Sequence, residues 1–522
     1  MSAFPLPVRG AFRLRSVQDA WHHRALGVVV AVGAIEVTLL ALGRLDLVPY
    51  AAGGGLCALY AHGLPFAARA RALALVVLGM AAGTGVALTT AALTESAAVR
   101  VAVAALLAAA HKVVCDATRI GPPGNVIFTF VAASAAFLPQ SPAQVPAHTG
   151  LVLLGGAVAW LVCMAPVLMR PHVPERTAVA RALEARARAL ANGGTAGSRH
   201  EAIAAVHAAR HTLRAARTTA HATGLERLLA RAEAADPAEA ARLTEWARAL
   251  RRTRTLPDPG PAARTPGPDP AARTPAPSPG TRTGRAGRPH RPAPRHLLPL
   301  GLRVLLGSAL GGWGSLALGV DRPYWAVVTA AAVFAANTTL SWHRALQRVL
   351  GNLLGVLLFT ALVPLTTTGA VALIVTALVC NVAAEATIAR NYWIASAFVT
   401  PMAMIMTEFA GALPTGRLVA DRWLDTLVGA AAGLLACFAV PNRHAGRRVG
   451  AALERLEDEL AAPVARGARL TAALLELREA ADTASGEWRS PALPERRIAA
   501  AEERGHLTLA GRRQGGRSVT TA

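Results

Sequence analysis

Long apolar segments recur along the chain in two groups of six, and polar stretches rich in Arg separate and flank the groups. An α-helix needs about 20 predominantly apolar residues to cross the hydrocarbon core of a bilayer, and most segments are close to that length. The first group is predicted at 25–42, 47–64, 72–93, 99–115, 126–138 and 150–169, and the second at 298–320, 325–340, 346–363, 369–386, 392–408 and 424–440. The pattern predicts an all-α polytopic membrane protein with about 12 spans.

The second group repeats landmarks of the first in the same order and at a nearly constant offset. Pro49-Tyr50 returns as Pro323-Tyr324, Gly79 with Gly83 as Gly351 with Gly355, Asp116-Ala-Thr as Glu385-Ala-Thr, and Gly155 with Cys163 as Gly429 with Cys437. A constant offset across a whole block indicates a duplication. We therefore predict two parallel-repeated six-helix transmembrane modules, at residues 25–170 and 298–441, an arrangement that many transporters share.

The polar regions predict further helices outside the membrane. Residues 1–24 form a basic N-terminal segment, and the apolar run after it has no small-residue cleavage site, so we expect this run to be a retained first span. Residues 171–254, rich in Ala, Arg, Glu and Leu, predict a cytosolic helical region. Residues 255–297, dominated by Pro and Arg, predict a disordered linker. Residues 442–522 predict a cytosolic helical segment and a basic tail, partly disordered from about residue 489.

Composition agrees with a membrane location and suggests an orientation. Hydrophobic residues make up 53% of the chain and charged residues only 16%, less charge than a soluble protein of this size carries. The net charge of +23 lies mainly in the three polar regions, and Arg and Lys concentrate on the cytoplasmic side of membranes. We expect a cell (plasma) membrane protein whose N- and C-termini are both cytoplasmic. Arg322, Arg417 and Arg422 depart from this rule because they fall on the predicted outside.

The same composition excludes several other classes of protein. A basic chain can bind nucleic acid, but no helix-turn-helix, zinc finger or aromatic-interleaved basic motif is present, so we expect contact with anionic membrane lipids instead. The five cysteines lack Cys-x-x-Cys spacing and predict neither a disulfide framework nor a metal site. Without a Walker A motif or a grouping of nucleophile and base, we expect no cofactor and no enzymatic activity.

Two consecutive motifs in the second module carry a resemblance to a known family. Val320-Asp-Arg-Pro-Tyr-Trp-Ala-Val-Val-Thr-Ala-Ala-Ala-Val-Phe334 is followed by Trp342-His-Arg-Ala-Leu-Gln-Arg-Val-Leu-Gly-Asn-Leu-Leu-Gly355. This region resembles the fusaric acid resistance family, which is related to the aromatic acid exporters; the resemblance is weaker in the first module and absent from the linker. It implies two six-helix halves with cytosolic helices, and export of small, often aromatic, carboxylic acids or similar toxic compounds.

Glu36 is the clearest candidate for a coupling residue. It lies in the middle of the first predicted span, and Gly312 takes its place in the second module. An ionisable group at the centre of a bilayer costs roughly 2.5–3.5 kcal/mol on insertion scales, so its presence asks for an explanation. Glu36 is either a proton carrier or a carboxyl group held protonated against a neighbouring helix, and the sequence leaves both open.

Asp116 and Glu385 are acidic at equivalent positions, at the inner ends of the fourth spans. They are candidates for coupling or gating. Lys112 precedes Asp116 by one helical turn and Arg390 follows Glu385 by five residues, so each carboxylate is alternatively one half of a local ion pair. Two further candidates, Asn125 and Asn391, open the fifth spans, where they either cap helices or line the pathway.

Aromatic and basic residues of the second module are candidates for contact with an anionic substrate. Tyr324 and Trp325 begin a span, where aromatic rings commonly anchor at the bilayer surface, and substrate stacking is the alternative. The basic residues His343, Arg344 and Arg348 either obey the topology rule or capture an anion.

Four glycines are expected to serve helix packing. Gly79 with Gly83, and Gly351 with Gly355, have the spacing that lets two transmembrane helices approach closely.

The function that the sequence favours is proton-driven export of small organic acids. The alternatives left open are a passive organic-anion channel and a non-transporting membrane scaffold for envelope assembly. The sequence also leaves a homo-oligomer open.

Overall fold

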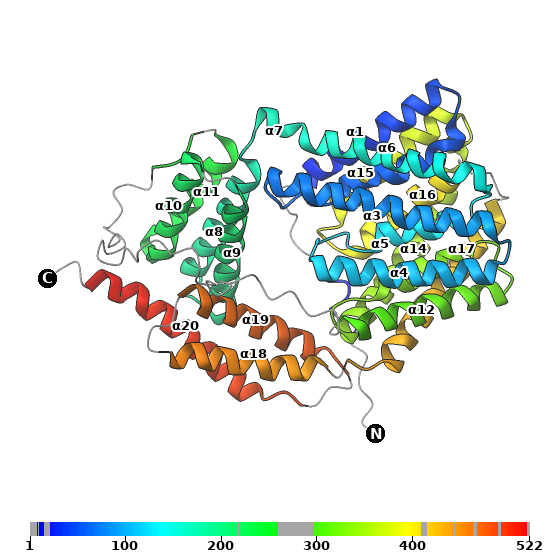
Figure 1. Cartoon of the computed structure of the whole chain (residues 1–522). Helices are drawn as coiled ribbons and strands as arrows, with labels where there is room; N and C mark the ends of the chain where they lie inside the picture. Colours follow the sequence, from blue (N-terminus) through cyan, green and yellow to red (C-terminus); the bar gives the residue numbers. More distant parts are fainter. Residues whose placement is uncertain are drawn as a thin grey trace, which may run out of the picture.

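The computed structural model describes residues 8, 10–14, 21–216, 219–253, 255–258, 297–408, 415–442, 444–462, 467–488 and 492–518. Helices joined by turns and loops account for these ranges, and no strand occurs within them, so the all-α prediction is confirmed (Figure 1). Of the predicted linker, only residues 255–258 and 297 belong to the described part of the chain, and most of the basic segment before residue 21 lies outside it.

The apolar helices fall into two groups. The first comprises α1 (Trp21–Ala41), α2 (Val48–Gly55) with the 3-10 turns η1 (Leu45–Leu47) and η2 (Leu56–Leu59), α3 (Phe66–Leu93), α4 (Ala97–Thr118), α5 (Val126–Ala135), and α6 (Val145–Met164), which follows η3 (Pro142–Gln144) and precedes α7 (Pro166–Met169). The second comprises α12 (Leu298–Ala317), α13 (Tyr324–Val333), α14 (Thr338–Thr366), α15 (Ala370–Thr387), α16 (Tyr392–Glu408) and α17 (Thr415–Ala439).

Length and composition support a multi-pass membrane protein. Within the described residues, eight helices are long and apolar enough to cross a membrane, namely α1, α3, α4, α6 with its flanking turns, α12, α14, α15 and α17. The remaining predicted spans correspond to shorter apolar helices at Leu45–Leu59, Val126–Ala135, Tyr324–Val333 and Tyr392–Met406. Two of these helices, α2 and α13, are short at their N-terminal ends. Pro49 and Pro323 lie there beside tight turns, and a proline inside a helix removes a backbone hydrogen bond, so the helix seldom extends to the N-terminal side of it.

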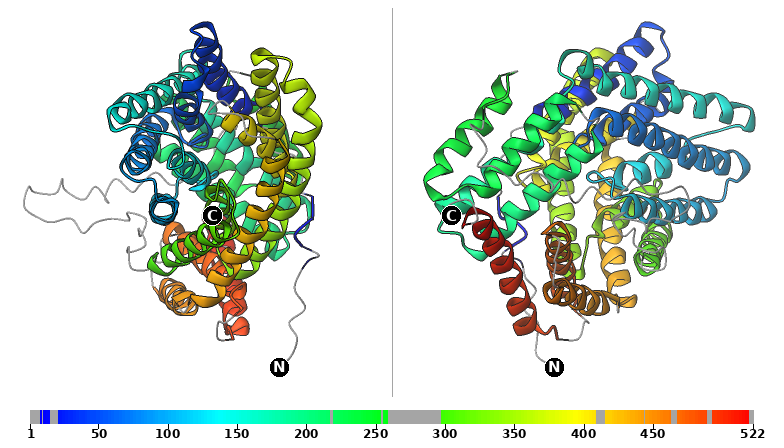
Figure 2. Two further views of the ribbon diagram at one scale, coloured as in Figure 1. Left: turned by 90° about the vertical axis from the view of Figure 1, so that its right-hand side faces the viewer. Right: turned by 60° about the vertical axis from the view of Figure 1, so that its left-hand side comes forward.

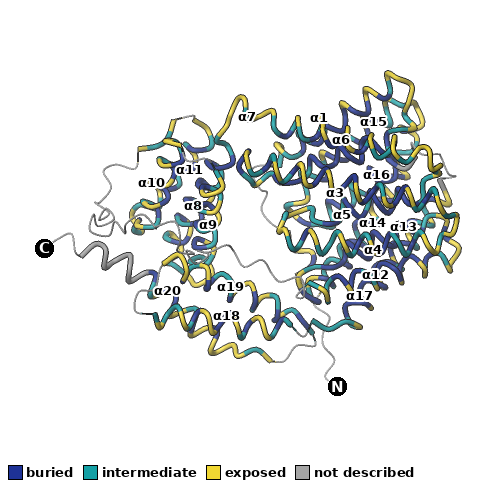
Figure 3. Tube along the Cα trace, in the orientation of Figure 1, coloured by how far each residue is buried: buried dark blue, intermediate teal, exposed yellow. Residues whose placement is uncertain are grey.

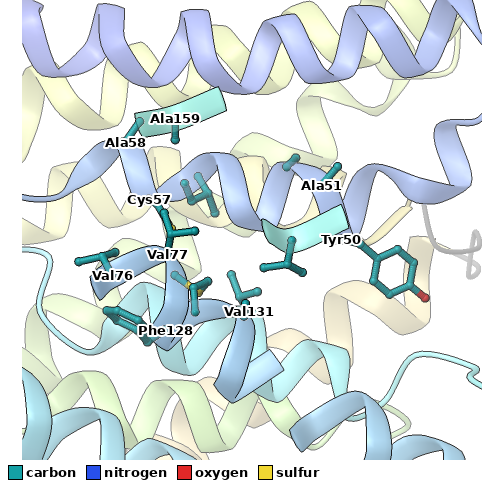
Figure 4. Packing of buried hydrophobic residues seen from close by; sticks show 14 of the residues in the cluster. Tyr50, Ala51, Cys57, Ala58, Val76, Val77, Phe128, Val131 and Ala159 are labelled. Carbon is teal, nitrogen blue, oxygen red and sulfur yellow. The ribbon is translucent and has the colours of Figure 1, made fainter. Parts of the chain in front are cut away.

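Small residues bring the helices of each group together. α2 packs against α6, where a Cβ atom added to Gly155 would overlap the carbonyl oxygen of Ala51. In the second group α13 packs against α17, where a Cβ atom on Gly429 would lie 2.5 Å from the carbonyl oxygen of Ala326. Side chains of α2, η2, α3, α5 and α6 then fill the interior of the first group, with Cys57 and Val77 near its centre (Figure 4). Close backbone approach and van der Waals packing hold such helices together in lipid.

The two groups interlock through their first helices. α1 packs against α15 of the second group, and α12 packs against α4 of the first (Figure 1). At the first contact Arg24 Nε lies 3.6 Å from a carboxylate oxygen of Glu385, and at the second the indole of Trp313 donates to the carbonyl of Ala98 at 3.0 Å. Each first helix therefore packs against both its own group and the other one.

Two helical appendages lie beside one end of the bundle (Figure 2). One consists of α8 (Val173–Ala191), α9 (Ala196–Ala215), α10 (Ala220–Ala234), the turn η4 (Pro237–Glu239) and α11 (Ala240–Arg252), and the other of α18 (His444–Ala461), α19 (Gly467–Ser485) and α20 (Glu495–Ser518). Each has its own buried apolar core, and α9 contacts α19 (Figure 3). In the predicted tail after residue 489, α20 places Ile498 and Ala501 in an apolar core against α18 and α19.

We call the end of the bundle beside the appendages the appendage end and the opposite one the loop end. At the appendage end a buried ion pair fixes the C-terminal appendage to the second group. Arg303 of α12 donates to both carboxylate oxygens of Glu487, at 3.2 Å each, and to the carbonyl of Val440 at 2.6 Å. The hydroxyl of Thr338 donates to the same carboxylate at 2.6 Å. The segment after α19 is thereby joined to α12 and α14 of the bundle.

The contact at Gly155 can be tested with a matched pair of variants. Gly155→Ala is expected to destabilise the protein by roughly 1–3 kcal/mol, because the added methyl group forces α2 and α6 apart. Gly150→Ala on the same helix is the control, since a Cβ atom there meets nothing within 4 Å and alanine favours a helix. Thermal unfolding in detergent should separate the two variants; equal transition temperatures would contradict the described contact.

Candidate functional site

A buried polar cluster lies inside the second group of helices, centred on Asn352 of α14. The Asn352 amide nitrogen donates to the hydroxyl of Thr426 at 3.1 Å, and its amide oxygen accepts from Ser396 at 3.2 Å and from Thr400 at 2.7 Å. The cluster thus joins α14, α16 and α17. Buried polar groups of this kind persist because each finds partners on neighbouring helices.

The glycines on either side of Asn352 make this arrangement possible. Gly351 and Gly355 lie against α16, where Cβ atoms would come within 2.5 Å of the carbonyl oxygen of Trp393 and within 2.8 Å of that of Ala397. A larger residue at either position would push α16 away and break the bonds to Ser396 and Thr400. The glycine pair therefore fixes the distance between α14 and α16, which the Asn352 side chain bridges.

Towards the loop end the cluster continues to a buried arginine, Arg422 of α17. Only 2% of its surface is exposed, and its guanidinium carbon lies 3.9 Å from the centre of the Trp325 ring. Its Nε and Nη1 atoms are buried and have no hydrogen-bond partner among the residues that the structure describes. A guanidinium that stacks on an aromatic ring retains its hydrogen-bond donors for a planar anion.

Asp425 lies one helical turn from Arg422, and it is fully buried. One of its oxygens accepts a hydrogen bond from the hydroxyl of Ser315 on α12, and the other has no partner within the described ranges. Arg422 and Asp425 form no ion pair with each other in the described part of the chain. The carboxylate nonetheless compensates part of the charge of the guanidinium, because the two groups share a low-dielectric interior.

Towards the appendage end the cluster includes two further cations. Arg348 of α14 is buried and donates to the hydroxyl of Tyr392 at 3.1 Å, and the guanidinium carbon of Arg344 lies 4.2 Å from the centre of the same ring. Two buried arginines, Arg348 and Arg422, therefore outnumber the one buried carboxylate of this cluster, Asp425, and Arg344 lies partly exposed on the Tyr392 ring. An excess of positive charge in a dry interior favours the binding of an anion.

An aromatic wall connects this cluster to the first group of helices. The rings of Trp325 and Phe130 of α5 are stacked with centres 5.4 Å apart, and those of Tyr324 and Phe137 are 5.7 Å apart. Tyr324 and Trp325 are both buried, so the expectation that they anchor at the bilayer surface is wrong. Their helix, α13, packs against α4, α5, α12 and α17 and thus lies inside the bundle.

Glu36 is completely buried on α1, and neither of its carboxylate oxygens has a hydrogen-bond partner among the described residues. Its helix packs against α2, α6 and α15 and contributes no residue to the cluster around Asn352. The structure therefore places two separate buried carboxyl groups in the bundle, Glu36 and Asp425.

The equivalent acidic residues Asp116 and Glu385 both form ion pairs. Lys112 Nζ lies 3.1 Å from Asp116 on the same helix, as the spacing suggested. The partner of Glu385 is Arg24 of α1, not the neighbouring Arg390, which is exposed. The local pair expected for Glu385 is thus replaced by a contact between the two groups of helices.

The two paired asparagines have different surroundings. Asn125 is buried at the start of α5, but its side chain does not cap the helix, and its amide nitrogen has no partner in the described ranges. Asn391 donates to the carbonyls of Ala11 and Arg13, at 3.1 Å each. Gln347 of α14 donates to the same oxygen of Ala11, so the N-terminal segment bridges α14 and α16 beside Tyr392.

The remaining candidates lie near these features. The ring of His343 lies against Gly10 of the N-terminal segment, 3.2 Å from where a Cβ atom would be. In the first group, a Cβ atom on Gly83 would approach the ring of His111 to 2.6 Å, and one on Gly79 would lie 3.4 Å from Phe128. Gly79 and Gly83 thus face side chains alone, whereas their counterparts Gly351 and Gly355 face both side chains and backbone carbonyls.

Sequence reasoning missed the residues at the centre of the site. Asn352, Ser396, Thr400, Asp425 and Thr426 were not singled out, and Arg422 was treated as a loop residue outside the membrane. Two signals were available. Arg422 and Asp425 are spaced to share one face of a helix that continues into an apolar run, and Asn352 lies directly between the two glycines of a packing motif.

Comparisons with known proteins support a membrane protein related to the family that the motifs suggested. Residues 307–436 match the family described as "Fusaric acid resistance protein-like", which confirms the resemblance carried by the motifs of the second module. The chain is also 28% identical over 532 residues to an uncharacterized membrane protein of Bacillus subtilis, YvaC, covering 92% of this chain and 83% of that protein. No solved structure matches the chain significantly.

Proposed function

We propose that this protein is a proton-driven exporter of small organic acids, aromatic ones included, and that Arg422 binds the substrate carboxylate. The observation that carries the proposal is the burial of the Arg422 guanidinium on Trp325 with two nitrogens left without a hydrogen-bond partner among the described residues. A carboxylate that reached this position would accept hydrogen bonds from these nitrogens, and its ring would meet an aromatic surface. The match to the fusaric acid resistance-like family supports the same class of function.

Asp425 acts as the internal counter-ion of Arg422. A buried guanidinium without a partner is costly, and a carboxylate one turn away lowers that cost. An incoming anion competes with Asp425 for electrostatic attraction to the Arg422 guanidinium. Asp425→Asn should therefore strengthen binding of the anion and slow its release. Arg348, Arg344 and Tyr392 extend the same positive interior towards the appendage end, which provides a path for the anion.

Glu36 is the proton carrier of this proposal. Its carboxyl group is buried without a charged or hydrogen-bonded partner in the described part of the chain, so a change in its protonation is not opposed by the loss of an ion pair. Asp116 and Glu385 are engaged with Lys112 and Arg24, which supports a structural role for both.

The membrane arrangement that we propose has twelve spans in two repeated modules, with both termini in the cytoplasm. It is supported by the matching order of helix contacts, since α2 packs on α6 as α13 packs on α17, and α1 packs on α15 as α12 packs on α4. Single cysteines at positions 44, 95 and 141 should then react with an impermeant thiol reagent added outside intact cells. Labelling only after lysis would reverse the orientation.

The decisive experiment is uptake of labelled aromatic acids into inverted vesicles that hold the protein, with and without an imposed pH gradient. Accumulation that requires the gradient is expected of the wild type. Glu36→Gln is expected to retain exchange of substrate across the membrane and to lose the response to the gradient. Equilibration without accumulation would favour a channel, and an absence of flux together with envelope defects in a knockout would favour a scaffold.

A further inference from the structure

A shallow groove of about 310 Å³ lies between α14 and α17 of the second group. Its lining residues are all apolar, namely Phe12, Trp342, Ala345, Leu346, Val349, Leu350, Leu353, Ala430 and Leu434. The four leucines and Val349 are only partly buried, so the groove opens outwards. Both helices are long and apolar enough to cross a membrane, and the groove therefore faces the acyl chains of the bilayer.

The length of the groove matches the depth of one leaflet. It extends along α14 from Trp342 to Leu353, and at 1.5 Å per residue this step is about 16 Å. Half of a hydrocarbon core of about 30 Å is about 15 Å. The groove begins at the appendage end, because α14 starts there with Thr338 bonded to Glu487. It therefore extends from one surface of the bilayer towards the midplane, as an acyl chain does.

The N-terminal segment closes the surface end of the groove. The carbonyl of Ala11 accepts hydrogen bonds from Gln347 of α14 and from Asn391 of α16, and the carbonyl of Arg13 accepts a further one from Asn391 at 3.1 Å. Phe12 lies between these two fixed carbonyls and lines the groove. Its side chain is nevertheless 38% exposed, so an apolar surface held in place by the bundle is left uncovered there.

The surface end of the groove also carries positive charge. Arg13 follows Phe12 directly, is exposed, and forms no ion pair with any residue that the structure describes. The carboxylate of Glu487 at the start of α14 does not offset this charge, because Arg303 engages both of its oxygens. An apolar groove one leaflet deep with a cation at the membrane surface is complementary to a lipid with an anionic headgroup.

We propose that this groove is a binding site for one anionic phospholipid, whose acyl chain lies along α14 beneath Phe12 and whose phosphate contacts Arg13. Charge complementarity favours this occupant over a second copy of the chain, since the exposed large side chains of α14 and α17 are apolar or aromatic and offer no anion to Arg13. The bound lipid bridges the N-terminal segment and α17. The inference goes beyond the proposed export function and does not depend on it.

Native mass spectrometry of the purified full chain in detergent tests the site, with dioleoyl phosphatidylglycerol and dioleoyl phosphatidylcholine as probes. These lipids have the same acyl chains and differ in net charge. The wild type should bind one phosphatidylglycerol more tightly than phosphatidylcholine. Arg13→Gln should weaken phosphatidylglycerol about fivefold, the factor that corresponds to one basic residue near the membrane surface. Leu350→Trp should weaken both lipids about tenfold or more, because the indole fills the groove.

Two matched controls separate this site from general lipid contact. Arg71→Gln removes an exposed arginine of α3 outside the groove, and Leu357→Trp adds an indole to α14 at a leucine that is 56% exposed and does not line the groove. Both should bind phosphatidylglycerol as the wild type does. Arg13 is exposed, so Arg13→Gln tests the charge even if Leu350→Trp yields little folded protein.

Equal affinity of the wild type for the two lipids would overturn the inference, as would folded Leu350→Trp that binds phosphatidylglycerol like the wild type. An equal loss in Arg71→Gln and Arg13→Gln would also overturn it, because overall basic charge would then account for the binding. A dimer that excludes the lipid and that Leu350→Trp disrupts would assign the groove to a second copy instead.

Discussion

Replacing Arg422 by Met is expected to lower gradient-driven uptake into inverted vesicles by about 100-fold, a loss typical of removing one partner of a buried charged contact. Met retains much of the length and apolar surface of the side chain but offers no hydrogen bond to a carboxylate. The protein should still reach the membrane, because Ser315 continues to satisfy one oxygen of Asp425. Uptake is measured per amount of protein in the vesicles.

Two further variants serve as comparisons for this prediction. Arg422→Lys retains the charge but loses the planar stacking on Trp325, so it should retain part of the activity. Arg417→Gln changes an arginine on the same helix whose side chain is 65% exposed, and it should leave transport unchanged. If Arg422→Met transports like the wild type, the anion binds elsewhere in the bundle, and the proposed substrate contact is wrong.

Arg303→Met is expected to cause the largest loss of stability, roughly 3–5 kcal/mol, because it leaves the Glu487 carboxylate buried without its cation. Both side chains are no more than 5% exposed, so water cannot replace the lost partner. The effect should appear as a lowered first transition in thermal unfolding. Detachment of α18 and α19 from the bundle should accompany it, seen as faster protease cleavage after α19.

The double variant Arg303→Met with Glu487→Met distinguishes two effects: the cost of burying an unpaired charge, and the loss of the contact that attaches the C-terminal appendage to the bundle. It should recover much of the lost stability, since replacing both members of a buried pair by apolar residues is often close to neutral. Arg478→Met removes an exposed partner of Asp482 and Glu502, and it should cost at most about 1 kcal/mol. A single and a double variant of equal stability would argue against a buried ion pair at this joint.

The sequence was sufficient to predict the helical class because span length and apolar composition are local properties. Eight of the predicted spans correspond to helices long enough to cross a bilayer. The predicted spans left a short loop around Pro323, whereas Pro49 lay inside the predicted span 47–64. Local patterns did not reveal which helices lie at the centre of the bundle. The short α13 is as apolar as a lipid-facing helix, yet all of its residues are buried inside the bundle.

The missed site illustrates the same limit. Arg422 is stable inside the bundle because Trp325, nearly one hundred positions earlier in the chain, provides the ring beneath it. Similarly, Glu385 finds Arg24 on a helix from the other end of the chain. Each pairing depends on tertiary contacts that helix periodicity does not specify. A charged residue near a predicted span boundary therefore reads as a loop residue until its distant partner is known.

The contacts that the first helix of each group makes with the other group have a consequence for synthesis. α1 ends at Ala41, whereas its packing partner α15 begins at Ala370, so at a ribosomal rate of about 5–20 residues per second the first helix waits roughly 15–65 s for its neighbour. During that interval Arg24 lacks Glu385 as a partner. α4 waits in the same way, for α12. The first six helices can thus pack on one another, but α1 and α4 complete their contacts only when the second group is made, so the final maturation step should be late and sensitive to changes far downstream of these helices.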